Sequence, residues 1–167
     1  MAETQVRMGE LAASAAAGDV LVSLGLGSCI GLALLDRRTG VAGLAHVVLP
    51  DSGNNATDNK LKFADHAVPE LVERVVAKGG RRLRLEAALV GGASMFATSS
   101  ATLEVGSRNE AAVREQLKAL RIPVIAAETG GKRGRTIRVH VSSLQVTVRE
   151  AGGKDEELVA PRGQVAA

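Results

Sequence analysis

A cysteine after a glycine-rich turn is the feature of this sequence best suited to chemistry. Residues 24–29 read Leu-Gly-Leu-Gly-Ser-Cys, and Cys29 is the single cysteine of the chain. His46, one of three histidines, follows it. A thiol and an imidazole that meet in space can act as nucleophile and base. A tight turn can also present backbone N–H groups, here near Gly27 and Ser28, as an oxyanion hole.

Two adjacent strands are predicted to hold this pair. Residues 29–36 form a nearly continuous apolar run, which is typical of a strand buried on both faces. Residues 36–40 form a turn, and a second apolar run follows at 41–49 and stops at Pro50. Two such runs around a short turn predict a β-hairpin.

The register of this hairpin decides whether the thiol and the imidazole share a face. If Asp36 lies opposite Val41, then Gly31 lies opposite His46. Cys29 and His46 are then diagonal neighbours on one face, within reach of a long side chain. Gly31 is expected to leave room for the imidazole to lean toward the sulfur. A slip of one residue would place the two side chains on opposite faces.

Ser23 is the candidate third member of the site. Its hydroxyl can return over the turn and orient His46, as in a catalytic triad. The alternative is structural, because a buried cysteine usually behaves as a small hydrophobe and a histidine in an apolar strand usually belongs to the core. From the residues alone both interpretations stay open. The Gly-x-Gly spacing lacks the third glycine and helix start of a dinucleotide fingerprint.

The remaining patterns predict a single α+β domain, a layered α/β sandwich with a mostly antiparallel sheet and two main helices. We expect this domain to cover residues 1–150 and a flexible tail to cover 151–167. The other expected strands lie at 20–24, 82–90 (half-exposed), 122–128, 136–142 and 144–150. One helix is expected from about 58, kinked or shortened at Pro69, and a second begins with a capping box at Ser107 and Glu110. Loops are expected at 51–57 and 97–106.

Composition excludes several classes of function. The chain has 167 residues, of which 46% are hydrophobic and 23% charged, and its net charge is +3. It has no Trp or Tyr and two Phe, which argues against a stacking platform for nucleic acid. No Cys/His spacing suits zinc, and no segment resembles a signal peptide or a membrane span. We therefore expect a cytoplasmic protein without metal or organic cofactor and without membrane insertion.

Several longer motifs stand in order along residues 5–150. They are residues 24–29, Ala45-His46 leading to Leu49-Pro50-Asp51-Ser52, residues 62–65 and 67–69, Gly91-Gly92-Ala93-Ser94-Met95-Phe96, Gly106-Ser107-Arg108-Asn109, and Gly130-Gly131 with Gly134-Arg135. In this combination they resemble the chemoreceptor glutamine deamidases of the CheD family. Several motifs in the same order are a far more specific signal than any one of them.

The resemblance implies a protein-glutamine glutaminase, an amidohydrolase that converts glutamine side chains of methyl-accepting chemoreceptors to glutamate and releases ammonia. Cys29 matches the family's nucleophile and His46 its base. The family's threonine falls on Ser23, so the hydroxyl is kept and a methyl group is lost. The implied substrate is the helical cytoplasmic domain of a receptor, with the loops at 51–57 and 97–106 as candidate recognition surfaces. A CheC-type phosphatase, which acts on phosphorylated CheY, is a candidate partner.

Two other functions fit the same residues. A different Cys–His enzyme, such as a peptidase or a transglutaminase-like acyltransferase, would share the thiolate chemistry and differ in its acceptor. A non-catalytic chemotaxis module would keep Cys29 in the core and only bind a signalling partner, such as a CheC-type phosphatase. Deamidation of glutamine would indicate the deamidase, peptide-bond cleavage another Cys–His enzyme, and binding without any reaction the non-catalytic module.

Overall fold

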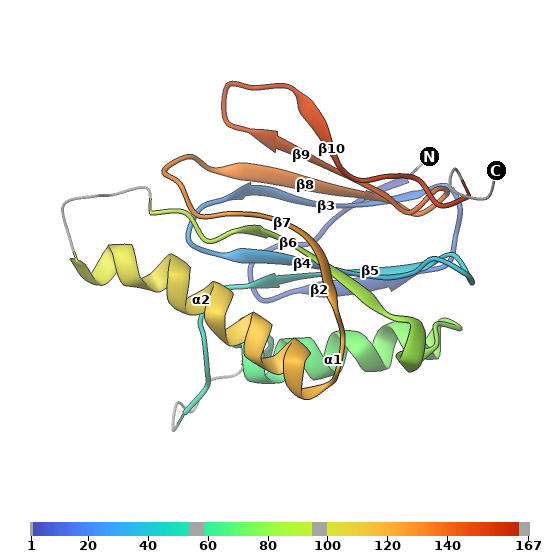
Figure 1. Cartoon of the computed structure of the whole chain (residues 1–167), viewed down its shortest axis with the longest axis horizontal. Coiled ribbons are helices and arrows are strands. Elements are labelled where there is room, and N and C mark those ends of the chain that lie inside the picture. The colour runs from blue at the N-terminus through green and yellow to red at the C-terminus, as the bar shows by residue number, and fades with distance from the viewer. Residues whose placement is uncertain (1, 54–58, 95–99, 164–167) are drawn as a thin grey trace.

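The computed structural model describes residues 2–53, 59–94 and 100–163, and within them it confirms a single-domain α+β fold (Figure 1). The elements are β1 (Ala2–Gln5), β2 (Leu11–Ser14), β3 (Asp19–Leu26), β4 (Ile30–Asp36), β5 (Val41–Val47), the 3-10 turn η1 (Lys60–Lys62), α1 (Ala64–Ala77), the 3-10 turn η2 (Arg82–Arg84), β6 (Glu86–Gly91), α2 (Ser100–Ala119), β7 (Val124–Thr129), β8 (Arg135–His140), β9 (Gln145–Glu150) and β10 (Asp155–Val159). The bounds of α1 show that the helix runs through Pro69 without a break.

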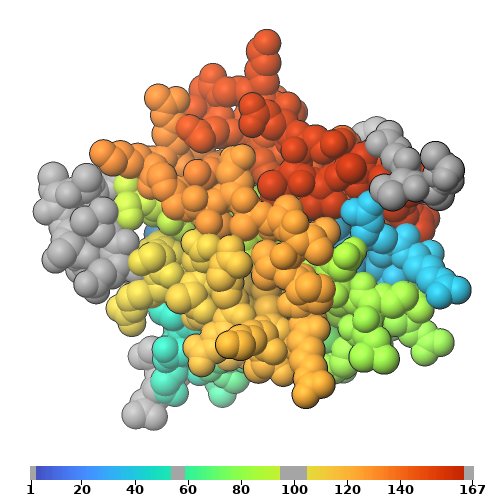
Figure 2. Space-filling view, viewed as in Figure 1, coloured from blue at the N-terminus to red at the C-terminus, as the bar shows by residue number. Residues whose placement is uncertain are grey.

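The described strands form two five-stranded sheets rather than the one sheet expected. The central sheet has the order β2-β5-β4-β6-β7, and the outer sheet has the order β1-β3-β8-β9-β10. Both are mixed, because β6 pairs with β7 and β1 pairs with β3 in parallel, while the other pairs are antiparallel. In the space-filling view the orange and red strands of the outer sheet lie above the yellow surface of α2 (Figure 2).

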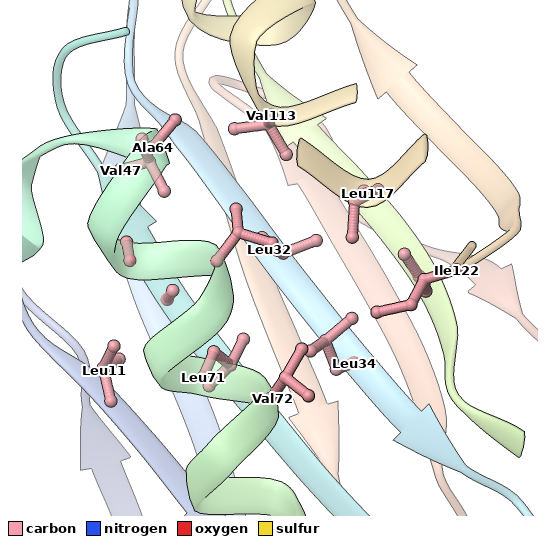
Figure 3. Packing of buried hydrophobic residues seen from close by; sticks show 14 of the residues in the cluster. Leu11, Leu32, Leu34, Val47, Ala64, Leu71, Val72, Val113, Leu117 and Ile122 are labelled. Atoms are coloured by element: carbon pink, nitrogen blue, oxygen red, sulfur yellow. The ribbon is translucent and has the colours of Figure 1, made fainter. Parts of the chain in front are cut away.

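Two apolar layers hold the helices and the sheets together. Strand β4 is buried on both faces, as its apolar run predicted. Leu32 and Leu34 point toward the helices, where they meet Leu71 of α1 and Leu117 of α2 (Figure 3). The alternate residues of β4 pack in the second layer, between the two sheets. The central sheet is thus covered on one face by helices and on the other by the outer sheet.

The strand expected at 82–90 is confirmed from Glu86 onward, whereas its predicted start and its half-exposed character are wrong. Residues Arg82–Arg84 form the turn η2, and Leu83 is 99% exposed. The strand β6 begins at Glu86 and lies between β4 and β7 in the central sheet, so both of its faces are buried. The alternating pattern was misleading because Arg82 and Arg84 precede the strand and Glu86 stands at its first position.

The loop expected at 97–106 and the capping box at Ser107 are also wrong. Helix α2 already contains residues from Ser100 onward, which places Ser107 and Glu110 inside it. Glu110 accepts a hydrogen bond from Arg114 at 2.9 Å, one turn later in the helix, instead of capping. Residues 97–99 lie outside the described part of the chain, as do most residues of the loop expected at 51–57.

The flexible tail predicted from residue 151 is wrong for its middle part. Strand β10 pairs antiparallel with β9, and Val159 is buried against the layer between the sheets. Arg162 donates hydrogen bonds to the carbonyls of Arg37 and Arg38 at 3.1 and 3.3 Å. The Gly/Lys/Glu-rich composition hid a short edge strand, because an edge strand needs few apolar residues.

Candidate active site

The hairpin register that joins Cys29 and His46 is confirmed. In the β4–β5 pair, Asp36 lies opposite Val41 and Gly31 lies opposite His46. Cys29 immediately precedes β4 and packs in the layer between the two sheets. His46 follows Leu44, which packs in the same layer, by two residues on β5, so it points to the same face. Both side chains are largely buried, with Cys29 9% and His46 6% exposed.

A backbone carbonyl fixes the orientation of His46. His46 Nδ1 lies 3.0 Å from the carbonyl oxygen of Val6, in the segment after β1. Because a carbonyl only accepts, Nδ1 must carry the hydrogen. In the neutral imidazole the lone pair is then on Nε2, which is the form of a general base.

Ser23 supports the same carbonyl rather than His46 itself. Its Oγ donates a hydrogen bond to the Val6 carbonyl at 2.8 Å. The Ser23 side chain is 0% exposed. Ser23 and His46 therefore meet at one acceptor, which is the point where the predicted triad differs from the structure. Val6 was missed because a backbone carbonyl gives no signal in the sequence.

Gly31 does not make room for the imidazole in the way expected. A Cβ placed on Gly31 would lie 2.9 Å from Leu26 Cδ1 and 3.0 Å from Ile137 Cγ2. Side chains from β3 and β8 of the outer sheet fill this space. The glycine is thus needed for packing between the sheets, directly beside the site.

Burial sets the resting protonation of the pair. It raises the pKa of the Cys29 thiol above 9.0. It also lowers the pKa of His46 below 6.5, against the opposing effects of the Val6 carbonyl and Glu10. Among the described residues no hydrogen bond joins Cys29 Sγ to His46, and in ligand-free sites such bonds are often long. The resting site is a neutral thiol beside a neutral imidazole.

The three carbonyls of the turn at Gly27–Cys29 are all held by hydrogen bonds. The donors are Ala93 N to Gly27 O at 2.8 Å, Asn109 Nδ2 to Ser28 O at 2.9 Å, and Gly92 N to Cys29 O at 2.9 Å. In a trans peptide the N–H points away from the C=O. The N–H groups of Ser28 and Cys29 therefore point away from these donors, and within the described ranges neither has an acceptor.

Gly91 brings these donors close to the turn. A Cβ on Gly91 would lie 2.2 Å from the carbonyl oxygen of Cys29, and its φ is +115°. Only glycine tolerates this approach and this backbone conformation. The first glycine of the 91–96 motif thus lets the end of β6 pack directly against the peptide of Cys29.

The other two histidines lie outside this arrangement. His66 Nε2 is 3.2 Å from Ser52 Oγ, and His140 Nε2 is 3.2 Å from Thr147 Oγ1. In the part of the chain that the structure describes, no group of three His, Cys, Asp or Glu side chains gathers as for a metal ion. No described helix is long and apolar enough to span a membrane.

Comparison with known proteins extends the match beyond the site. Residues 48–150 match the family model described as CheD chemotactic sensory transduction. A protein of Clostridium botulinum strain Hall, named "Probable chemoreceptor glutamine deamidase CheD", is 43% identical over 143 residues, which is 84% of this chain and 88% of the relative. A protein of the same name from Moorella thermoacetica is 44% identical over 136 residues, 79% of this chain and 81% of the relative. On this evidence the chain belongs to the CheD family.

Proposed function

We propose that the protein is a chemoreceptor glutamine deamidase, in which Cys29 is the nucleophile and His46 the base. Membership of the CheD family and the names of the relatives support the activity. The observation that carries the assignment of residues is the orientation of His46. Its Nδ1 is held by the Val6 carbonyl at 3.0 Å, so Nε2 carries the basic lone pair, on the face that His46 shares with Cys29.

Acylation begins from the neutral pair. His46 Nε2 takes the thiol proton as Cys29 Sγ bonds to the carboxamide carbon of the glutamine. The carboxamide oxygen becomes an oxyanion, and the outward N–H groups of Ser28 and Cys29 stabilise it. This fits the turn predicted at Gly27 and Ser28, with the donors assigned to Ser28 and Cys29. Collapse of the intermediate breaks the C–N bond, and His46 gives its proton to the leaving ammonia.

Deacylation returns the enzyme to its resting state. Water attacks the thioester while His46 Nε2 accepts one of its protons. The C–S bond then breaks, and the proton on His46 returns to the Cys29 sulfur. The net reaction is glutamine plus water to glutamate plus ammonia. None of these steps calls on a metal ion or an organic cofactor.

The substrate follows from the family's chemistry. We propose the helical cytoplasmic domain of a methyl-accepting chemoreceptor, where the target glutamine stands on a helix surface. The family resemblance also makes a CheC-type phosphatase a candidate partner. Calorimetric titration with such a phosphatase tests this second proposal, and the absence of heat at high concentration would exclude it.

The test of the activity is mass spectrometry of a receptor cytoplasmic fragment after incubation with the protein. We expect the mass gain that accompanies conversion of Gln to Glu, together with release of ammonia. Cys29→Ala should abolish both while leaving the far-ultraviolet circular dichroism unchanged, because Ala fills most of the same small buried site. Cleaved receptor would indicate a peptidase instead. An unmodified receptor that binds wild type and variant alike would indicate a non-catalytic module.

A further inference from the structure

We propose that Asn109 is a positioning residue that orients the Ser28–Cys29 peptide and so builds the oxyanion hole. Asn109 lies on α2, far along the sequence from the nucleophile, and its side chain is 0% exposed. This inference rests on the proposed deamidase function and adds to it a residue that touches neither the substrate nor the reacting atoms.

The Asn109 amide binds the residue before Cys29 and the residue across the hairpin from it. Its Nδ2 donates to the carbonyl of Ser28 at 2.9 Å and to the carbonyl of Val48 at 2.9 Å. Val48 is the residue that the hairpin register places opposite Cys29. One amide group thus links the Ser28–Cys29 peptide to the residue directly after β5, the strand that carries His46.

The direction of these bonds sets the direction of the Cys29 N–H. Asn109 belongs to the helix layer, on the opposite face of the central sheet from the Cys29 and His46 side chains. The carbonyl of Ser28 therefore points toward the helices. Because the peptide is planar and trans, the N–H of Cys29 points away from the helices and toward the face of the thiol. That is where the oxyanion forms.

The cost of this arrangement supports a role beyond packing. Asn109 Oδ1 is buried without a hydrogen-bond partner among the described residues. Leaving such an oxygen unsatisfied destabilises the folded protein, and a leucine of similar shape would avoid this cost. Asn109 provides N–H donors to the carbonyls of Ser28 and Val48, although its Oδ1 is left without a partner among the described residues. The donors to these two carbonyls are therefore the reason we infer for an asparagine at this place.

Helix α2 packs closely against the residues that follow β6, which fixes the position of Asn109 relative to the turn. Gly106, one turn before Asn109, faces the end of β6. A Cβ on Gly106 would lie 2.6 Å from the oxygen of Gly92 and 2.8 Å from the oxygen of Ala93. Gly92 and Ala93 are the residues whose N–H groups hold the carbonyls of Cys29 and Gly27. Gly106 and Asn109 together account for the motif at 106–109.

The test compares two reactions of Cys29 in Asn109→Leu. Deamidation of a receptor fragment passes through an oxyanion, whereas alkylation by iodoacetamide does not. We expect kcat for deamidation to fall about 100-fold with little change in KM, since an oxyanion-hole donor acts in the transition state. The rate of alkylation and its pH profile should match wild type. The matched control is Val113→Ala, which removes buried volume one turn later on α2 and should leave kcat unchanged.

Three results would overturn the proposal. Wild-type kcat in Asn109→Leu would show that the amide does not orient a catalytic group. A parallel loss of alkylation and deamidation would show that Asn109 holds the fold or the thiol instead. Absence of deamidation by the wild-type protein would instead remove the proposed function, and this inference with it. If Asn109→Leu does not fold, Asn109→Ser keeps one donor in a smaller side chain and is read against the same three results.

Discussion

Replacing Ser23 by alanine separates its role from that of His46. In the structure Ser23 Oγ and His46 Nδ1 share the carbonyl oxygen of Val6, at 2.8 and 3.0 Å. Ser23→Ala removes one of these two bonds and leaves the carbonyl with His46 as its partner. No buried acceptor is orphaned, and the imidazole keeps the contact that fixes its tautomer.

The magnitude follows from the loss of one neutral hydrogen bond. Such a bond contributes about 0.5–1.5 kcal/mol to stability, so the free energy of unfolding should fall by about 1 kcal/mol. If all of that energy were lost from the transition state, kcat would fall by no more than about tenfold. Removal of a general base costs about 10²–10⁴-fold, so His46→Ala should be far more damaging.

The assay measures kcat for deamidation of a receptor fragment and urea unfolding of the same samples. Ser23→Thr keeps the hydroxyl and carries the residue that the family resemblance implies here, so it should recover wild-type turnover. Ser14→Ala is the matched control, since Ser14 is also buried and donates to Asp19 at 2.5 Å away from the site. It should lose stability without losing turnover.

Two outcomes would refute this reasoning. If Ser23→Ala folds but is as inactive as Cys29→Ala, then Ser23 acts directly on the imidazole or the substrate, and the shared carbonyl is not its route. If turnover and stability both stay at the wild-type level, the bond to Val6 contributes nothing to either.

The remaining predictions concern pH. Burial holds the pKa of His46 below 6.5, and only neutral His46 can accept the thiol proton, so kcat/KM should fall as the pH decreases with a midpoint below 6.5. An acid limb centred above 6.5 would contradict the assignment of a buried His46 as the group that accepts the proton. Asp36 is 0% exposed, and although burial opposes its ionisation, hydrogen bonds from Arg84, Arg81 and Thr39 lower its pKa from 3.8 to about 2. The ionised form therefore adds about 2 kcal/mol to stability above pH 3.8, which is lost as the pH falls toward 2. In urea unfolding at pH 7, the free energy of unfolding of Asp36→Asn should be lower than that of wild type by this amount, and it should change less as the pH falls. The control Glu73→Gln, at an exposed carboxylate, should lower the free energy of unfolding by less than about 1 kcal/mol.

The sequence was most informative where interactions are local. The short turn at 36–40 and two apolar runs predicted the β4–β5 hairpin, and the register with Asp36 opposite Val41, one of those considered, is the one in the structure. That register placed Cys29 and His46 on one face, and the motifs around them pointed to the CheD family. Strands β8 and β9 were predicted for the same reason, since their alternation is clean and their connection is short.

Errors arose where tertiary contacts override local pattern. Helix α2 starts before Gly106, in a stretch rich in Ser and Thr, because the helix packs against the end of β6 and the core rather than relying on intrinsic propensity. Strand β10 forms because β9 offers it a free edge. The surface that α2 packs against and the strand edge that β10 pairs with are formed by other segments. The sequences of α2 and β10 therefore do not predict them.

The chemistry of the site divides in the same way. The sequence by itself pointed to the candidate reactive groups, a thiol and an imidazole on the two paired strands of one hairpin, and to the hydroxyl of Ser23. Only the tertiary structure decided what orients them. Val6 contributes a backbone carbonyl, which every residue has, and Asn109 acts across a helix–sheet interface from a distant segment. Such partners are set by how the layers close on one another, since backbone groups carry no side-chain identity and contacts between layers have no fixed spacing along the chain.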